Sequence, residues 1–396
     1  MTDVAPRAAR SVFTVFVLSG VLISSTLSRV PQIRDALHLS PGRLGLLLLT
    51  TAVGSLVSLP LAGAVVQRIG AARTVSVMTL VAAVGLGVVA IGSEVGPLVV
   101  GAGLFVYGFG NGQWDVAQNV EGAAVEQQLG RSIMSRFHAA FSVGAVIGAL
   151  GGVAMNAFHI RPLIHLLAIA IVVALVGPAG ARGFLPMHRD EHAVDERPSA
   201  WQAWTEPRTL LIGLFVLCAA FAEGTGNDWL GVATIDGYRS SAAVGSFMYV
   251  AFVAAMTIGR WFGPRVLDRY RRVPVLRAGA LCSTAGVLVV VFGPSLGTAV
   301  VGTVLWGLGT ALGFPTGMSA AADDPARAAS RVSAVATIGY AAFLAGPSLI
   351  GAIGNHTGVL RALTLTAGVL AVGFLAAGST RPLNTGQETL EASRSS

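Results

Sequence analysis

Five amide or carboxyl side chains lie within an otherwise apolar stretch at 97–120. Asn111, Asp115 and Asn119 are spaced four residues apart, so on a helix they form one stripe, which Gln118 widens. A charged group within a bilayer costs at least about 2.5 kcal/mol, so such an acid faces a water-filled cavity or a partner. Burial favours the neutral form of a carboxylic acid, which suits reversible proton binding. We predict Asp115 as a proton-binding residue; the alternative is a carboxylate held permanently by a partner.

A second polar pair lies in the stretch at 208–229, where Glu223 and Asn227 are also four residues apart. Two intramembrane acids suit a proton relay or a clamp on a solute, so we predict Glu223 as the second proton-binding residue. Asp228 is a weaker candidate, because the following Trp229 marks the membrane interface, where water solvates a carboxylate.

Arg29 and His138 are the candidate cationic groups. The donors of Arg29 suit an anionic solute group or an ion pair with Glu223, and the alternative is an arginine that extends to the membrane interface. His138 suits proton transfer near neutral pH, or else packs in the interior. The aromatic candidates fit a solute ring and a packed core equally well. The predicted walls of a solute cavity are Arg29, Asn111, Gln113, Trp114, Gln118, Asn119, His138, Asn227, Trp306 and Tyr340.

The composition places these residues in a membrane protein. Of 396 residues, 54% are hydrophobic and 11% are charged, against roughly 25% charged in a soluble protein. Mean hydropathy is +0.72, and stretches of the roughly 20 apolar residues that span a bilayer recur along the chain. The 26 basic residues, all arginine, are spread over short connectors, so the net charge of +7 indicates no nucleic-acid partner. We predict an all-α membrane protein in contact with the lipid bilayer.

Twelve spans are predicted, six in each half of the chain. The longest polar stretch, 183–207, separates the two sets and is typical of a cytoplasmic linker. The predicted domains are therefore an N-terminal half at 1–182, the linker, a C-terminal half at 208–380 and a cytoplasmic tail at 381–396. The spans are 11–30, 43–66, 74–92, 97–120, 134–157, 162–182, 208–229, 243–266, 274–293, 297–319, 328–352 and 358–379.

The distribution of arginine predicts the orientation, since connectors on the cytoplasmic side of a membrane carry an excess of positive residues. With both termini in the cytoplasm, all but six of the 26 arginines fall at cytoplasmic helix ends or connectors. The opposite orientation would invert this bias. The six on the other side are Arg29, Arg34, Arg43, Arg161, Arg239 and Arg361.

The two halves repeat each other in sequence, and the repeated features occur in the same order. Two parallel six-span repeats are how one class of transporters builds a central site. The repeated features are 63–70 with 263–269, 107–110 with 306–309, and Arg131 with Arg331.

The segment at 63–73 resembles the signature of the major facilitator superfamily, G-x-x-x-D-R-x-G-R-R, with Gln67 in place of the usual Asp. The second-half copy keeps Asp268 and Arg269. The resemblance implies the major facilitator fold, with twelve transmembrane helices in two six-helix halves. It also implies a conformational latch formed by Arg68, Asp268 and Arg269. Positive-inside anchoring is the alternative for the arginines, but it leaves Asp268 unexplained.

The segments at 108–122, 136–144 and 222–229 resemble the YbjJ-type inner-membrane permeases and, more distantly, the fucose–proton symporters. In those symporters the proton is handled by an acid followed four residues later by Asn, a spacing that Asp115 and Asn119 share. Their acid in the first span has no counterpart here. The resemblance implies a proton-coupled symporter for a small polar, sugar-like solute in the bacterial inner membrane. We also expect the protein to function as a monomer.

Two other functions stay open. A proton-driven exporter of amphipathic compounds typically has a Gly-Pro pair in the fifth span, whereas this chain has Gly346-Pro347 in the eleventh. A non-transporting receptor with a transporter fold would not need the polar stripe. No HExxH, G-x-S-x-G or phosphate-binding loop appears, and Cys218 and Cys282 have no metal-ligand spacing. We therefore predict no enzyme activity, no cofactor and no metal site.

The topology is tested with single cysteines placed within 188–197, in a chain whose Cys218 and Cys282 are replaced. We expect these thiols to resist membrane-impermeant reagents in intact cells and to react after the cells are opened, because the linker is predicted to be cytoplasmic. Rapid labelling from outside intact cells would overturn the predicted orientation.

Overall fold

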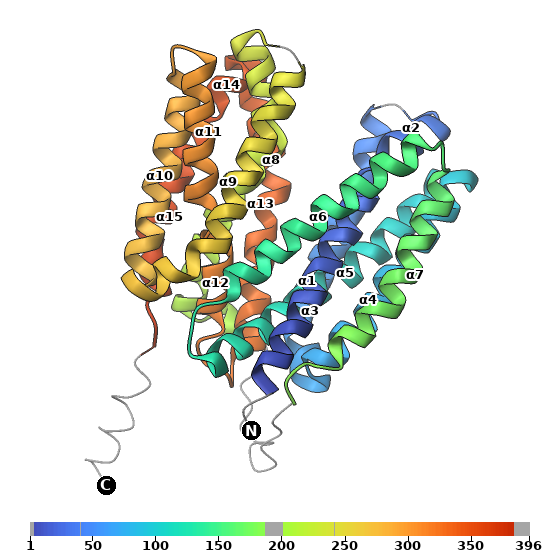
Figure 1. Ribbon diagram of the computed structural model, residues 1–396, viewed down its shortest axis with the longest axis vertical. Helices are drawn as coiled ribbons and strands as arrows, with labels where there is room; N and C mark the ends of the chain where they lie inside the picture. The colour runs from blue at the N-terminus through green and yellow to red at the C-terminus, as the bar shows by residue number, and fades with distance from the viewer. Residues whose placement is uncertain (1–3, 40, 187–200, 241, 384–396) are drawn as a thin grey trace.

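The computed structural model describes residues 4–39, 41–186, 201–240 and 242–383, and its described elements are helices (Figure 1). Residues 187–200 of the predicted linker and 384–396 of the predicted tail lie outside the described residues. The first half contains α1 (Val4–Leu27), α2 (Val30–Ala36), α3 (Pro41–Ile69), α4 (Ala71–Val95), α5 (Pro97–Leu129), α6 (Met134–Ala157) and α7 (Pro162–Ala181). The second contains η2 (Gln202–Trp204), α8 (Pro207–Tyr238), α9 (Ala242–Tyr270), α10 (Arg272–Phe292), α11 (Leu296–Thr310), α12 (Gly313–Ala321), α13 (Ala328–Thr357), α14 (Val359–Ala362), α15 (Thr364–Ala376) and η3 (Ala377–Thr380).

Each predicted span coincides with one helix or with consecutive short helices, so the twelve-span prediction is consistent with the structure. Nine helices or helix runs among the described residues are long and apolar enough to cross a membrane. The spans outside that set are α5, α9 and α13, which are the helices that carry or approach the polar groups described below. In α5 and α9, polar side chains within the span, Asp115 and Arg260 among them, lower the mean hydropathy.

The tenth span is divided into α11 and α12 by Pro315. Proline has no N–H, so the carbonyl of Ala311, four residues earlier, receives no helical hydrogen bond. The chain turns at Ala311 and Leu312 before α12 begins at Gly313. This leaves a buried backbone carbonyl that needs another donor.

Glycine allows α1 and α6 to pack at backbone contact. A Cβ atom on Gly144 of α6 would collide with the carbonyl of Val17 on α1, and one on Gly20 would collide with the carbonyl of Phe141. Lipid provides no hydrophobic drive for helix association, so close backbone approach through small residues supplies the attraction.

The two halves meet at the end of the molecule where α1 begins and diverge toward the other end (Figure 1). The contacts at the shared end include the Ser333 hydroxyl of α13, which donates to the carbonyl of Leu59 on α3 at 2.6 Å. Gln127 of α5 donates to the carbonyl of Ala322 at 2.7 Å. With both termini in the cytoplasm as predicted, this arrangement opens toward the outside.

The close packing of α1 on α6 is tested by Gly144→Val. We expect it to lower the free energy of unfolding by roughly 1–3 kcal/mol or more, because the added side chain forces two backbones apart. The melting temperature of the purified protein in detergent measures the effect. Gly151→Val on the same helix is the control, since nothing lies within 4 Å of a Cβ there. Equal melting temperatures of Gly144→Val and Gly151→Val would contradict the close packing of α1 on α6.

Candidate functional site

The Asp115 carboxylate of α5 is held by amides and by a residue of the other half. Its Oδ1 accepts hydrogen bonds from Gln118 Nε2 at 3.1 Å and Asn119 Nδ2 at 3.3 Å. The Tyr340 side chain of α13 also hydrogen-bonds to it, across the boundary between the halves. No described arginine or histidine forms an ion pair with Asp115. Neutralising Asp115 would therefore not remove the counter-charge of any described buried cation.

His138 of α6 extends this group of hydrogen bonds. Its Nε2 lies 3.1 Å from Asn119 Oδ1, and the ring is buried. It packs edge-on between Phe16 of α1, at 5.1 Å between ring centroids, and Phe314 of α12, at 5.5 Å. The sequence left His138 between proton transfer and interior packing, and its geometry is compatible with both. Asp115, Asn119 and His138 are connected by hydrogen bonds.

Glu223 of α8 is paired with Arg260, a residue that sequence reasoning missed. One guanidinium nitrogen of Arg260 donates to both carboxylate oxygens, at 2.8 and 2.7 Å. The Arg260 side chain is 4% exposed and that of Glu223 is 15% exposed. A signal was present, since Arg260 stands inside the predicted span at 243–266, where an arginine is rare and needs a partner.

The remaining donors of Arg260 connect it to two further elements. Its Nε donates to the carbonyl of Ala311 at 3.3 Å, which is the carbonyl that Pro315 leaves free. Its Nη1 donates to the hydroxyl of Ser142 on α6, in the other half, at 3.3 Å. Ser142 in turn donates to the backbone carbonyl of His138 at 3.2 Å.

Together these contacts form a polar network between the halves, which we define as Glu223, Arg260, Ser142, His138, Asn119 and Asp115. Its two carboxylates, Asp115 and Glu223, are groups that can each gain or lose a proton. Its hydrogen bonds cross the boundary at Arg260 and at Asp115. A change in the charge of either acid therefore acts on contacts that join the halves. This arrangement can couple protonation to relative motion.

Arg29 lies away from this network. Its side chain is fully buried at the turn between α1 and α2, where Nη2 donates to the carbonyl of Ile160 in the connection from α6 to α7. The ion pair with Glu223 considered from the sequence is wrong, because Arg260 occupies that carboxylate. The side chain is covered by protein at the connection from α6 to α7 and is not exposed.

The other predicted cavity residues fall into two groups. Asn111 and Gln113 are buried on α5, near Asp115, while Asn227 is half-buried one turn from Glu223 on α8. The second group is the two tryptophans, Trp114 and Trp306, which are fully buried. Trp306 packs edge-on against Phe252 at 5.5 Å, inside the second half. It shares no described contact with the polar network.

The predicted latch residues differ in their contacts. Asp268 at the end of α9 accepts a hydrogen bond from the Ser132 backbone N–H of the other half, at 3.0 Å. Arg269 stacks on its neighbour Tyr270, at 5.4 Å from the ring centroid. Arg68, in the first-half copy with Gln67, is exposed and has no hydrogen bond or ion pair with the described residues.

A polar cavity of about 240 Å³ adjoins Asp268 where the halves meet. Glu126 of α5 lines it and accepts from the N–H groups of Ile133 and Met134, at 2.6 and 2.8 Å, at the start of α6. Its other oxygen accepts from the hydroxyl of Ser319 on α12, across the boundary. Sequence reasoning missed Glu126, because the partners come from separate segments.

Two ion-pair clusters stiffen the second half, and the one at Asp323 adjoins this cavity. Asp323 binds Arg272 at 2.6 Å and Arg208 at 2.8 Å. Glu206, just before α8, binds Arg331 at 2.6 Å and Arg327 at 3.0 Å. Burial acts to raise the pKa of Glu206, but hydrogen bonds from Arg331, Thr209 and Arg327 and the charge of Arg331 hold this pKa below its usual value. Glu206 therefore stays charged at neutral pH.

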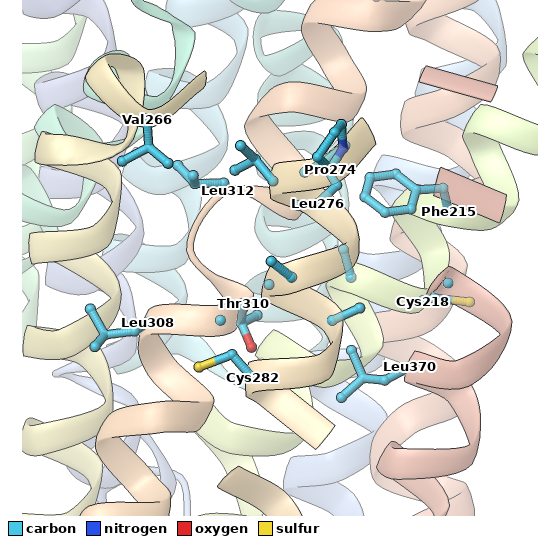
Figure 2. Close-up of a pocket in the computed structure, with 18 of the residues that line it drawn as sticks. Phe215, Cys218, Val266, Pro274, Leu276, Cys282, Leu308, Thr310, Leu312 and Leu370 are labelled. Carbon is cyan, nitrogen blue, oxygen red and sulfur yellow. The ribbon is translucent and has the colours of Figure 1, made fainter. Parts of the chain in front are cut away.

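A larger cavity, of about 480 Å³, lies within the second half and not between the halves (Figure 2). Its lining is almost wholly apolar and includes Cys218 and Cys282, both unpaired. Neither Asp115 nor Glu223 reaches it. This apolar cavity is therefore separate from the polar network.

Residues 12–347 match the family model of the Major Facilitator Superfamily. The chain belongs to this superfamily. It is 32% identical to an uncharacterised transporter of Sinorhizobium fredii, over 86% of this chain and 90% of that one. It is 30% identical to an uncharacterised MFS-type transporter of Yersinia pestis, over 93% of this chain and 94% of that one. The fold matches a crystal structure of the E. coli fucose:proton symporter with a TM-score of 0.79 and 15% identity, covering 97% of this chain and 100% of the symporter.

These comparisons make the protein a multi-pass membrane transporter with the major facilitator fold. The recognition and the fold class drawn from the sequence are confirmed. Since the superfamily consists of transporters, the prediction that the protein is not an enzyme is confirmed as well.

The latch is tested by Asp268→Asn, which keeps an acceptor for Ser132 but removes the charge. A charge-assisted hydrogen bond is worth roughly 1 kcal/mol more than a neutral one, so the balance of conformations should shift about fivefold toward opening on the side of the termini. Distances between spin labels on the two halves measure it. Arg68→Gln is the matched control, because Arg68 has no described partner. A shift in Arg68→Gln as large as in Asp268→Asn would contradict this assignment.

Proposed function

We propose that this transporter is a symporter that couples proton entry to the uptake of a small polar solute across the bacterial cytoplasmic membrane. Both termini are cytoplasmic in this proposal, with two six-helix halves at 1–182 and 208–380. The observation that supports it is the polar network between the halves, in which Asp115 and Glu223 are the proton-binding groups and both adjoin contacts that cross the boundary.

Protonation of Glu223 is the first proposed step. The carboxylate is 15% exposed, so it is accessible while the halves diverge on the outer side. Neutralising it removes the charge that holds Arg260, whose guanidinium cannot lose its own proton. Arg260 is then available to a hydroxyl or carbonyl oxygen of the solute. Its hydrogen bond to Ser142 links this event to the first half.

Asp115 supplies the second proposed step. The amides of Gln118 and Asn119 donate to Oδ1 of its charged form, and the Tyr340 contact attaches it to α13. A protonated Asp115 is a weaker acceptor for these donors, so the contact between α5 and α13 loosens. Return of the ionised form restores it after the proton leaves on the inner side.

A polar solute suits the groups at this boundary better than an amphipathic one. Asn111 and Asn227 each have a buried side-chain oxygen with no hydrogen-bond partner among the described residues. The structurally similar E. coli protein is a fucose:proton symporter, and a hydroxyl-rich solute would use such acceptors. An exporter of amphipathic compounds would instead need an apolar cavity between the halves, whereas the apolar cavity of about 480 Å³ lies within one half.

Proton coupling is tested by Asp115→Asn in proteoliposomes with an imposed pH gradient. We expect the variant to lose gradient-driven accumulation of the solute, found first by a thermal-shift screen of sugars and sugar acids, yet still to bind it. Because no described cation pairs with Asp115, the melting temperature should stay within a few degrees of wild type. A carboxylate that balanced a buried cation would instead cost roughly 3–5 kcal/mol when neutralised.

Asp228→Asn is the matched control for Asp115→Asn. Asp228 is an exposed acid on α8, so its neutralisation should leave accumulation unchanged. A well-folded Asp115→Asn protein that still concentrates its solute would overturn the role of Asp115. Uptake that is independent of the pH gradient in the wild type would overturn the proposed function itself.

A further inference from the structure

The apolar cavity of the second half is a formed site to which the transport cycle proposed above assigns no role. It lies among α8, α9, α10, α15 and the junction of α11 with α12 (Figure 2). A volume of about 480 Å³ falls in the range of small-molecule sites, roughly 300–1,000 Å³. Its lining includes Phe215, Cys218, Tyr270, Cys282, Thr310 and Leu370. Such a lining suits a hydrocarbon chain.

The mouth of the cavity faces lipid and not the other half. Asp268 of α9 contacts the first half. Residues two positions apart on a helix point to nearly opposite sides, so Val266 and Tyr270 face away from that contact. Their exposed fractions are 42% and 55%, as expected for side chains at an opening to the bilayer.

Three arginines stand at the same end of α9 and α10 as the mouth. Arg265, Arg269 and Arg271 are exposed, and none forms an ion pair with a described carboxylate. Arg269 stacks on Tyr270, which lines the cavity. By contrast Arg272, the next residue along, is neutralised by Asp323. Unpaired positive charge therefore lies directly beside an apolar opening, at the ends of two predicted spans, where a spanning helix meets the lipid headgroups.

We propose that this cavity binds one acyl chain of an anionic phospholipid, whose phosphate group lies on Arg269 and Arg271. The lipid comes from the leaflet on the side of the termini, where the mouth lies. The two parts of the site match the two parts of such a lipid, since hydrocarbon is buried in the apolar cavity and the phosphate meets guanidinium donors. A zwitterionic lipid would fill the cavity equally well but would gain less from the arginines.

The position of the cavity gives the bound lipid a structural role. Thr310, Leu312 and Gly313 line it and flank the junction between α11 and α12. The other side of that junction presents the Ala311 carbonyl to Arg260. An acyl chain would therefore pack against the back of the segment that holds Arg260. The site is distinct from the proposed proton and solute groups.

The proposal is tested on the purified full-length protein in nanodiscs of phosphatidylcholine, with and without phosphatidylglycerol. Native mass spectrometry after release from the disc should show phosphatidylglycerol retained in preference to phosphatidylcholine by at least tenfold. Leu370→Trp, which fills the cavity, should reduce the retention of phosphatidylglycerol at least tenfold. The double substitution Arg269→Gln with Arg271→Gln should remove the preference while leaving retention of phosphatidylcholine unchanged.

Matched controls keep the result specific. Leu375→Trp changes an exposed residue of the same helix, and Arg7→Gln with Arg10→Gln removes two exposed charges at the same end of the first half. Both controls should behave as wild type. Equal retention of the two lipids by the wild type would overturn the proposal, as would an equal loss in the Arg7 and Arg10 control.

A second measurement does not depend on a cavity-filling variant. In a chain whose Cys218 is replaced by alanine, Cys282 lines the cavity and reports on its occupancy. An apolar maleimide should react with it at least fivefold more slowly in nanodiscs that contain phosphatidylglycerol than in those without. An unchanged rate would overturn the proposal. Protection by amphipathic transport solutes but not by phosphatidylglycerol would overturn it in favour of a solute site.

Discussion

The buried guanidinium of Arg260 constrains the centre of this protein more than any other group. An arginine keeps its proton at every physiological pH, and a buried cation without partners costs several kcal/mol. Three acceptors offset that cost by accepting hydrogen bonds from the guanidinium: the Glu223 carboxylate, the Ala311 carbonyl and the Ser142 hydroxyl. Because Ser142 belongs to the other half, the solvation of one charge depends on how the halves are arranged. A proton on Glu223 would therefore act on the whole molecule.

The sequence predicted the scaffold well, because the bilayer imposes a simple rule on it. Runs of apolar residues between polar connectors marked every span, and the start of α6 at Met134 and of α10 near Arg272 followed from the polar residues around them. The stripe on α5 was predictable for the same reason, since positions four apart share a helix face. Hydrogen bonds from Gln118 and Asn119 to Asp115 are local and follow that spacing.

Contacts between segments far apart in sequence were not predictable from spacing. Glu223 could be expected to need a cation, but nothing in its neighbourhood indicated Arg260 over Arg29. Glu126 was not singled out from the sequence, yet it receives donors from the start of α6 and from Ser319 of the other half. The contacts of the predicted latch residues were likewise not predictable from the sequence. The two signature copies look alike in sequence, but Asp268 has a described hydrogen bond across the boundary and Arg68 has none.

The proline in α12 has a consequence beyond the shape of its helix. Pro315 exposes the Ala311 carbonyl only because it lacks an N–H, and Arg260 uses that carbonyl. Any other residue at 315 would bring a backbone N–H that competes for this carbonyl, and a residue without a donor at 260 would leave the carbonyl without its present partner. The two positions are thus chemically dependent on each other although they belong to different helices. Evolution is therefore expected to keep or lose them as a pair, and grafting either one alone into a relative would create an unpaired group.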